Sequence, residues 1–200
     1  MLEVVGSKGS RITRVMWMLE ELGLPYALRP AKPGSAAARA LNPTGRVPVL
    51  IDGDLVLADS AAICLYLGEK HPEKGIAAVS LAERAVMDSW MHFIQSELEM
   101  PMWTKLKHRL LLPEDLRVDV GPWVAWEFAR DAQSLAQRLG AGPFALGDRF
   151  TAVDVVLGHV LQWAKSAKFE PFPDPVAAYA ERVWARPALA RVRDREGEIA

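Results

Sequence analysis

The sequence of 200 residues contains one cysteine, Cys64. A single cysteine excludes an intrachain disulfide framework and a Cys-x-x-Cys redox pair, and it fits a reducing compartment. The sequence also lacks an excess of positive charge, since 24 basic residues stand against 25 acidic ones. A nucleic-acid partner needs clustered Lys and Arg to neutralise phosphates, so this balance argues against one.

Long apolar runs are missing as well. The most apolar expected helix, residues 152–164, contains Asp154 and His159 and is shorter than a bilayer requires. The N-terminal segment lacks the basic start and apolar run of a signal peptide. The histidines show no metal-ligand spacing, and no phosphate-binding loop ending in Lys-Ser or Lys-Thr occurs. We therefore expect a cytoplasmic protein that binds neither a metal nor a nucleotide and does not enter a membrane.

The first third of the chain predicts alternating strands and helices in the order β-α-β-α-β-β-α. The expected elements are residues 2–5, 12–22, 25–28, 36–41, 47–51, 55–57 and 59–70. The first two strands should be parallel, because a helix separates them. Asp52-Gly53 is a two-residue hairpin signal, so the last two strands should be antiparallel.

After His71–Gly75, which breaks the helical pattern, every element is expected to be helical. The expected helices are residues 81–107, 124–139, a third from Thr151, 176–184 and 187–195. Mixed charges over Arg191–Glu198 predict a solvated tail. The sequence thus predicts two domains, residues 1–76 and 77–200.

The Val47-Pro48 bond stands at the start of an expected strand. A cis bond there would turn the Val47 carbonyl and N–H out of the sheet, where they can pair with an extended peptide. The alternative is an ordinary trans proline at a strand edge.

Asp59-Ser60 opens the next helix. A helix N-terminus attracts an anion, so the Ser60 hydroxyl and first-turn N–H groups could hold a carboxylate while Asp59 holds an ammonium group. A ligand with both groups is the head of a γ-glutamyl peptide. Simple helix capping by the two side chains is the alternative.

Thr151 and Asp154 fit a capping box in which each residue satisfies the other's N–H group. The helix that they open is apolar nearly all round, so it should lie centrally in its domain. We therefore interpret both residues as structural.

Four segments together resemble the glutathione S-transferase family. They are Arg14–Tyr26 (RVMWMLEELGLPY), Leu41–Leu50 (LNPTGRVPVL), Asp59–Ile63 (DSAAI) and Thr151–Asp154 (TAVD). The resemblance covers nearly the whole chain. It implies an α/β plus all-α fold, with an N-terminal thioredoxin-like domain and a C-terminal helical bundle domain, and it implies a homodimer.

The resemblance also implies a glutathione site, in which the Val47 backbone pairs with the cysteinyl part of glutathione. The expected glutathione-binding residues are Ser10, Arg46, Val47, Pro48, Asp59 and Ser60. Arg46 would pair with the glycine carboxylate, or it is simply solvated. The acceptor pocket is expected to include Met100, Trp103 and Trp163, although such residues at helical spacing also suit a core.

Members of the family activate the thiol with a Tyr, Ser or Cys at the end of the first strand. Only Ser7 and Ser10 are present here, and Ser10 stands four residues before Arg14, as in serine-type members. Ser10 is therefore the expected catalytic residue. Ser7, or a backbone N–H near Lys8-Gly9, remains an alternative, and Ser10 also fits the position of a plain helix cap.

The implied function is conjugation of the glutathione thiolate to small, mostly apolar electrophiles. A glutathione-dependent disulfide reductase or peroxidase is an alternative, and so is a non-catalytic glutathione-binding scaffold. Cys64 lies inside an expected helix between apolar residues, which favours inert packing and weighs against a Cys-dependent thiol transferase.

Overall fold

The computed structural model describes residues 1–199. Two compact units divide the chain: Met1–Ala78 together with the segment from Trp184 onward, and Val79–Val183. The predicted domains 1–76 and 77–200 are consecutive stretches of sequence, and their boundaries stay a prediction. The structure differs from that division in one respect: the segment from Trp184 onward packs with the first unit. Within the described residues, no helix is long and apolar enough to cross a membrane.

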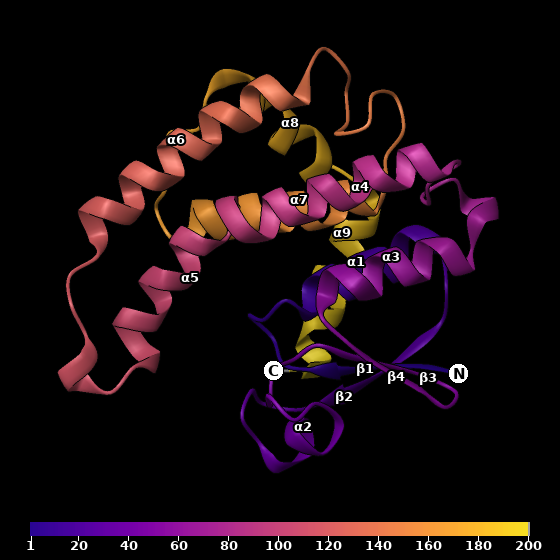
Figure 1. Cartoon of the computed structure of the whole chain (residues 1–200). Helices are drawn as coiled ribbons and strands as arrows, with labels where there is room; N and C mark the ends of the chain where they lie inside the picture. The colour runs from indigo at the N-terminus through magenta and orange to yellow at the C-terminus, as the bar shows by residue number, and fades with distance from the viewer. Residues whose placement is uncertain (200) are drawn as a thin grey trace. The chain divides into compact units, whose positions relative to one another are not determined.

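The first unit is built on one mixed sheet with the strand order β2-β1-β3-β4 (Figure 1). The strands are β1 (Leu2–Gly6), β2 (Tyr26–Pro30), β3 (Val49–Asp52) and β4 (Leu55–Ala58). β1 and β2 are parallel, whereas β3 is antiparallel to both β1 and β4. The predicted element order along the chain, the parallel β1–β2 pair and the antiparallel β3–β4 pair are confirmed.

Helices cover both faces of this sheet. They are α1 (Ile12–Leu22), α2 (Ala36–Leu41), α3 (Ser60–Lys70), α9 (Pro187–Arg195) and the 3₁₀ turns η1 (Pro72–Lys74) and η5 (Glu196–Ile199). Figure 1 shows α1 and α3 on one face of the sheet and α2 on the other. Val5 and Val49 form a buried cluster with Leu41 of α2 packed against it. Since side chains alternate along a strand, Val4 and Leu50 point to the opposite face.

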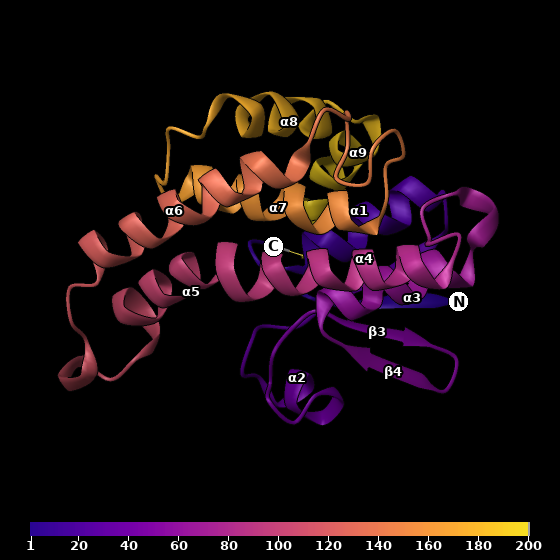
Figure 2. The same ribbon diagram turned by 45° about the horizontal axis from the view of Figure 1, so that its top comes forward.

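The second unit is helical (Figure 2). Its elements are α4 (Leu81–Phe93), η2 (Ile94–Leu98), α5 (Met100–Leu106), η3 (Lys107–Leu111), η4 (Glu114–Leu116), α6 (Gly121–Leu139), α7 (Ala152–Ser166) and α8 (Asp174–Trp184). The single helix expected over residues 81–107 is interrupted, because η2 is a π-helical turn and η3 is another. Apolar spacing does not reveal such turns, since they insert only one residue into the helical repeat.

Asp154 is buried at the start of α7, and four donors surround its carboxylate. Oδ2 accepts from the Thr151 N–H at 2.8 Å and from the Thr151 hydroxyl at 3.1 Å. Oδ1 accepts from the Ala145 N–H and from the Tyr179 hydroxyl, both at 2.8 Å. The capping box predicted from the sequence is present.

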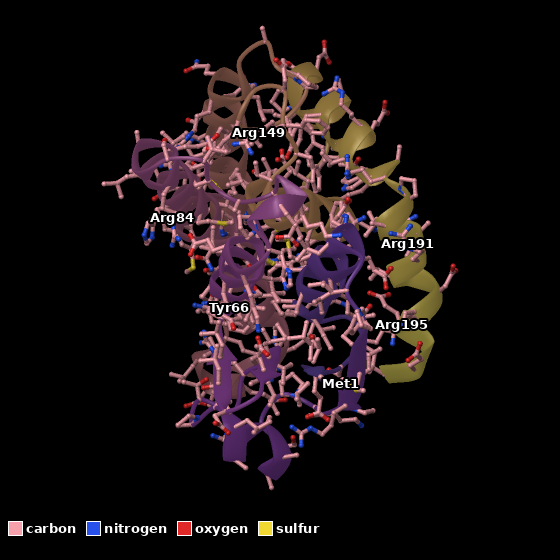
Figure 3. The ribbon with its side chains drawn as sticks, turned by 90° about the vertical axis from the view of Figure 1, so that its right-hand side faces the viewer. Met1, Tyr66, Arg84, Arg149, Arg191 and Arg195 are labelled. Atoms are coloured by element: carbon pink, nitrogen blue, oxygen red, sulfur yellow. The ribbon has the colours of Figure 1, made fainter. Side chains whose placement is uncertain are left out.

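The predicted solvated tail, Arg191–Glu198, is mostly exposed or half-buried, but Val192 within it is buried. α9 packs on α1, and Val192 is fully buried. Ile199 is also buried, with 1% of its surface exposed. Only one side of this segment meets solvent; Arg191 and Arg195 mark its charged side in Figure 3. The mixed charges lie largely on the exposed side of α9, the amphipathic helix that the sequence predicts over residues 187–195.

Candidate functional site

The segment before β3 is shaped by Gly45. Gly45 has a φ of +69°, and a Cβ there would meet Arg39 and Gly34 at 3.2 Å. The Gly34 N–H donates to the Gly45 carbonyl at 2.8 Å. Only glycine combines this backbone conformation with so close an approach. The chain is thereby folded back tightly just before Val47.

Val47 lies outside the sheet ladder, because β3 begins at Val49. The Val47-Pro48 bond is cis. Within residues 1–199, the Val47 N–H and carbonyl take no part in the backbone hydrogen bonds of turns and loops. The strand predicted over residues 47–51 therefore begins at Val49 in the structure. The N–H and carbonyl of Val47 lie outside the ladder and are available to a ligand.

Asp59 serves as the N-cap of α3. It has a φ of +77°, and its carboxylate accepts from the Ala61 N–H at 2.9 Å and the Ala62 N–H at 3.3 Å. We expected the first-turn N–H groups to be open to an anion, but Asp59 itself occupies those two. The Asp59 carboxylate is the acidic group at the start of α3, where the sequence predicts that an ammonium group binds.

Ser60 is 2% exposed, and its Oγ accepts from Nη1 of Arg14 at 3.1 Å. Because the arginine donates to the oxygen, the single hydroxyl proton of Ser60 is directed to another acceptor. Sequence reasoning missed this role of Arg14, which it used for the family resemblance and to locate Ser10. The available signal was that Arg14 stands in a largely apolar run, where a buried cation requires partners.

Ser10 lies between β1 and α1. Its hydroxyl donates to the Ser7 carbonyl at 2.7 Å, and its Oγ accepts from the Ile12 N–H at 3.3 Å. The alternative of a plain helix cap is met only in part, because Arg11 is the N-cap of α1 and Ser10 precedes it while still accepting from the Ile12 N–H. Ser7 is half-buried, and Gly9 between the serines has a φ of +73°.

The remaining predicted site residues are partly or fully accessible. Arg46 is exposed, and its carbonyl accepts from the Asn42 amide at 3.0 Å. In the second unit, Met100 is the first residue of α5 and is 37% exposed. Trp103 on α5 and Trp163 on α7 are half-buried. Each retains surface for a ligand, and their shared pocket stays a prediction.

Cys64 is fully buried on α3, with its Sγ 3.6 Å from the Arg14 carbonyl. Burial raises the pKa of the Cys64 thiol to about 12, well above its usual value. A thiol that stays protonated is a poor nucleophile and metal ligand, which agrees with an inert packing role.

Two family models match the chain. Residues 5–75 match the N-terminal domain of glutathione S-transferase, and residues 127–195 match its C-terminal domain. The first match spans the sheet, Val47, Asp59 and Ser60. The second spans Asp154.

Similar proteins of known name and structure cover most of the chain. Glutathione S-transferase 3 of Zea mays is 30% identical over 199 residues, which cover 90% of this chain and 87% of that protein. A glutathione transferase from Methylococcus capsulatus has a TM-score of 0.84 at 26% identity and covers all of both chains. A theta class enzyme from Xanthomonas axonopodis with glutathione bound has a TM-score of 0.75 at 29% identity over 95% of each chain. The chain belongs to the glutathione S-transferase family.

Proposed function

We propose that the protein is a glutathione transferase that binds glutathione along residues 45–62. The N–H and carbonyl of Val47 pair with the cysteinyl backbone of glutathione, as an added strand would. The observation that carries this proposal is the position of Val47 outside the β3 ladder, together with a buried Ser60 whose oxygen Arg14 holds at the start of α3.

The γ-glutamyl head binds at the start of α3. Its carboxylate accepts from the Ser60 hydroxyl, whose oxygen Arg14 already holds. Its ammonium group lies against the carboxylate of Asp59, which the Ala61 and Ala62 N–H groups hold at the start of α3. At the other end of the peptide, Arg46 is exposed and pairs with the glycine carboxylate.

The reaction is nucleophilic attack by the glutathione sulfur on a small, mostly apolar electrophile. The thiol loses its proton, a carbon–sulfur bond forms, and a leaving group such as chloride departs with the electron pair of its bond. The free thiol has a pKa of about 8.5, so the protein must favour the thiolate with a donor aimed at sulfur. Met100, Trp103 and Trp163 contribute to the acceptor pocket.

Ser10 is the proposed donor to sulfur. Its hydroxyl must turn from the Ser7 carbonyl to the thiolate when glutathione binds. The Ser7 hydroxyl, or a backbone N–H near Lys8-Gly9, is the alternative donor. The proposal further includes a homodimer in the cytoplasm, for which sedimentation of the purified protein tests the assembly.

Retention on immobilised glutathione and turnover of a chlorinated nitrobenzene test the function. The thiolate absorbance of bound glutathione, followed against pH, tests the donor. In Ser10→Ala the titration should move to higher pH, and an unchanged titration would remove Ser10 from this role. Ser7→Ala, measured in parallel, tests the alternative donor.

A second candidate function is supported by one specific observation. Because the Ser10 hydroxyl is engaged by the Ser7 carbonyl, the fold could bind glutathione without activating it, as a scaffold. Retention on glutathione without turnover of any electrophile would favour this scaffold. Reduction of a glutathione mixed disulfide without conjugation would instead favour a reductase.

A further inference from the structure

The C-terminal segment lies directly against the loop that carries Ser10. The Lys8 N–H donates to the Ile199 carbonyl at 3.1 Å. The Thr13 hydroxyl donates to Oε1 of Glu196 at 2.7 Å. These contacts join positions 183 or more residues apart in sequence. They lie on either side of Ser10, two residues before it and three residues after it.

Each contact has one buried partner, Ile199 in the first and Thr13 in the second, while Lys8 is exposed and Glu196 is half-buried. Ile199 is 1% exposed, and Thr13 is 8% exposed. The Thr13 hydroxyl also lies 3.5 Å from the carbonyl of Ser10 itself. Hydrogen bonds that exclude water hold their geometry more firmly than exposed ones. The loop is thus fixed at its two ends by residues outside it.

The helix that precedes this segment is itself held to α1 and β2. Arg186 donates two bonds to the Glu21 carboxylate, at 2.6 and 2.7 Å. Arg191 donates to Glu20 at 2.8 Å. The guanidinium of Arg195 stacks over the Tyr26 ring at 4.1 Å. Bidentate and stacked arginine contacts define orientation as well as distance, so α9 delivers Glu196 and Ile199 at a set position.

The loop between the two contacts needs such support. Gly9 has a φ of +73° and nothing within 4 Å of where its Cβ would be, so it does not restrain the chain by packing. The Ser10 side chain bonds locally, donating to the Ser7 carbonyl and accepting from the Ile12 N–H. Local bonds of a serine reorganise easily, whereas the direction of a donor toward sulfur must be held closely.

We propose that Glu196 and Ile199 are positioning residues for the Ser10 loop, and that they set the direction from which the loop donates to the glutathione sulfur. This inference rests on the proposed function. Neither residue touches the sulfur. Their effect passes through Thr13 and Lys8, whose contacts fix the two ends of the loop.

The proposal predicts that loss of the Thr13 contact lowers kcat and leaves the KM for glutathione nearly unchanged. Asp59 and Ser60 hold the γ-glutamyl head from the start of α3, outside the Ser10 loop, so the KM for glutathione should change little. Losing the Thr13 contact should raise the pH at which bound glutathione forms its thiolate. The loss of one such bond corresponds to about a fivefold decrease in kcat near neutral pH.

Glu196→Ala and Glu196→Gln form the test pair. Glutamine keeps Oε1 as an acceptor for the Thr13 hydroxyl, so Glu196→Gln should restore the wild-type thiolate titration while Glu196→Ala shifts it. Glu198→Ala is the matched control, because Glu198 lies in the same segment and pairs with Arg195. Its titration should equal that of the wild type. Thr13→Val removes the donor side of the bond and should reproduce Glu196→Ala.

Amide hydrogen exchange of residues 7–13 gives a readout that does not depend on turnover. Glu196→Ala should increase exchange of this loop in the absence of glutathione, and Glu198→Ala should not. The proposal is overturned if the wild type is active and Glu196→Ala and Thr13→Val leave both thiolate titration and loop exchange unchanged. It is also overturned if Glu196→Gln is as impaired as Glu196→Ala.

Failure of the proposed function would be distinguishable. In that case the wild type itself would neither bind glutathione nor turn over any electrophile, while loop exchange still reports whether Glu196 holds the loop. If wild-type activity is present and only KM for glutathione changes in Glu196→Ala, the segment supports binding and not sulfur activation, which contradicts the proposal.

Discussion

Removal of the Asp154 carboxylate should destabilise the second unit strongly. Its oxygens accept from the Ala145 N–H, the Thr151 N–H and hydroxyl, and the Tyr179 hydroxyl, at 2.8 to 3.1 Å. Burial raises the pKa of the Asp154 carboxyl, while these donors oppose that change by favouring the ionised form. In Asp154→Ala, the buried donors lose their acceptor and no solvent replaces it.

The magnitude follows from the number of donors left behind. Each buried and unsatisfied donor costs about 1–3 kcal/mol, and at least the two backbone N–H groups and the Tyr179 hydroxyl lose their partner. We expect a decrease in the free energy of unfolding of about 3–9 kcal/mol. For a chain of this size, about 1 kcal/mol corresponds to 2–4 °C, so the melting temperature should fall by about 6 °C or more.

Thermal melting and urea unfolding of purified variants measure this effect. Tyr179→Phe removes one donor and should reduce stability by about 1 kcal/mol. Asp148→Ala is the control, because Asp148 is exposed in the same loop and should change stability by less than about 0.5 kcal/mol. Folded Asp154→Ala should keep its turnover per molecule. If it melts like the wild type but loses turnover, the structural role is wrong.

The remaining predictions concern the binding site, the thiol and the acid stability. Ser60→Ala should raise the KM for glutathione about tenfold, the effect of one charge-assisted hydrogen bond, with kcat nearly unchanged. Cys64 should not react with a thiol reagent at pH 8 until the protein is unfolded, because burial raises its pKa. Hydrogen bonds from Lys70 and Tyr66 lower the pKa of Asp52, so this residue stabilises the fold above its unfolded pKa and loses that contribution as pH falls toward 3.

Each of these has an outcome that contradicts it. An unchanged KM in Ser60→Ala would mean that another group holds the glutamyl carboxylate. Labelling of Cys64 in the folded protein at the rate of a free thiol would show that α3 opens. For Asp52, unfolding midpoints at pH 7 and pH 3.5 are compared with those of Asp52→Asn. Equal losses of stability on acidification in both proteins would exclude a contribution from Asp52.

Much of the first unit follows from local sequence signals. Asp52-Gly53 fixed the β3–β4 hairpin, and the helical spacing of α1 between two short apolar runs required β1 and β2 to be parallel. These features depend on residues close together in the chain, which is where turn chemistry and periodicity act. The interruption by η2 was not visible, since a π turn leaves the apolar spacing almost unchanged.

The contacts missed by sequence reasoning are those between distant segments. Glu196 resembles any acidic residue of a solvated tail, and nothing near it in sequence indicates Thr13 as its partner. Arg14 similarly resembles a surface arginine until Ser60 is placed beside it. Arg14 is buried and Glu196 is half-buried by tertiary packing, and the fold shows which partner satisfies each of them.

The Ser10 hydroxyl donates to the Ser7 carbonyl, and this is compatible with catalysis if its bond to a glutathione thiolate is the stronger of the two. A neutral bond to the Ser7 carbonyl contributes about 1 kcal/mol, whereas a bond to a thiolate is charge-assisted and contributes about 1.5–3 kcal/mol. The hydroxyl should therefore turn to the sulfur once glutathione is bound. The net gain of about 0.5–2 kcal/mol corresponds to a thiolate pKa lowered by about 0.4–1.5 units, since about 1.4 kcal/mol is one unit. Ser10→Ala should shift the titration of bound glutathione upward within this range. A larger shift would mean that the substitution also disturbs the loop that Glu196 and Ile199 hold.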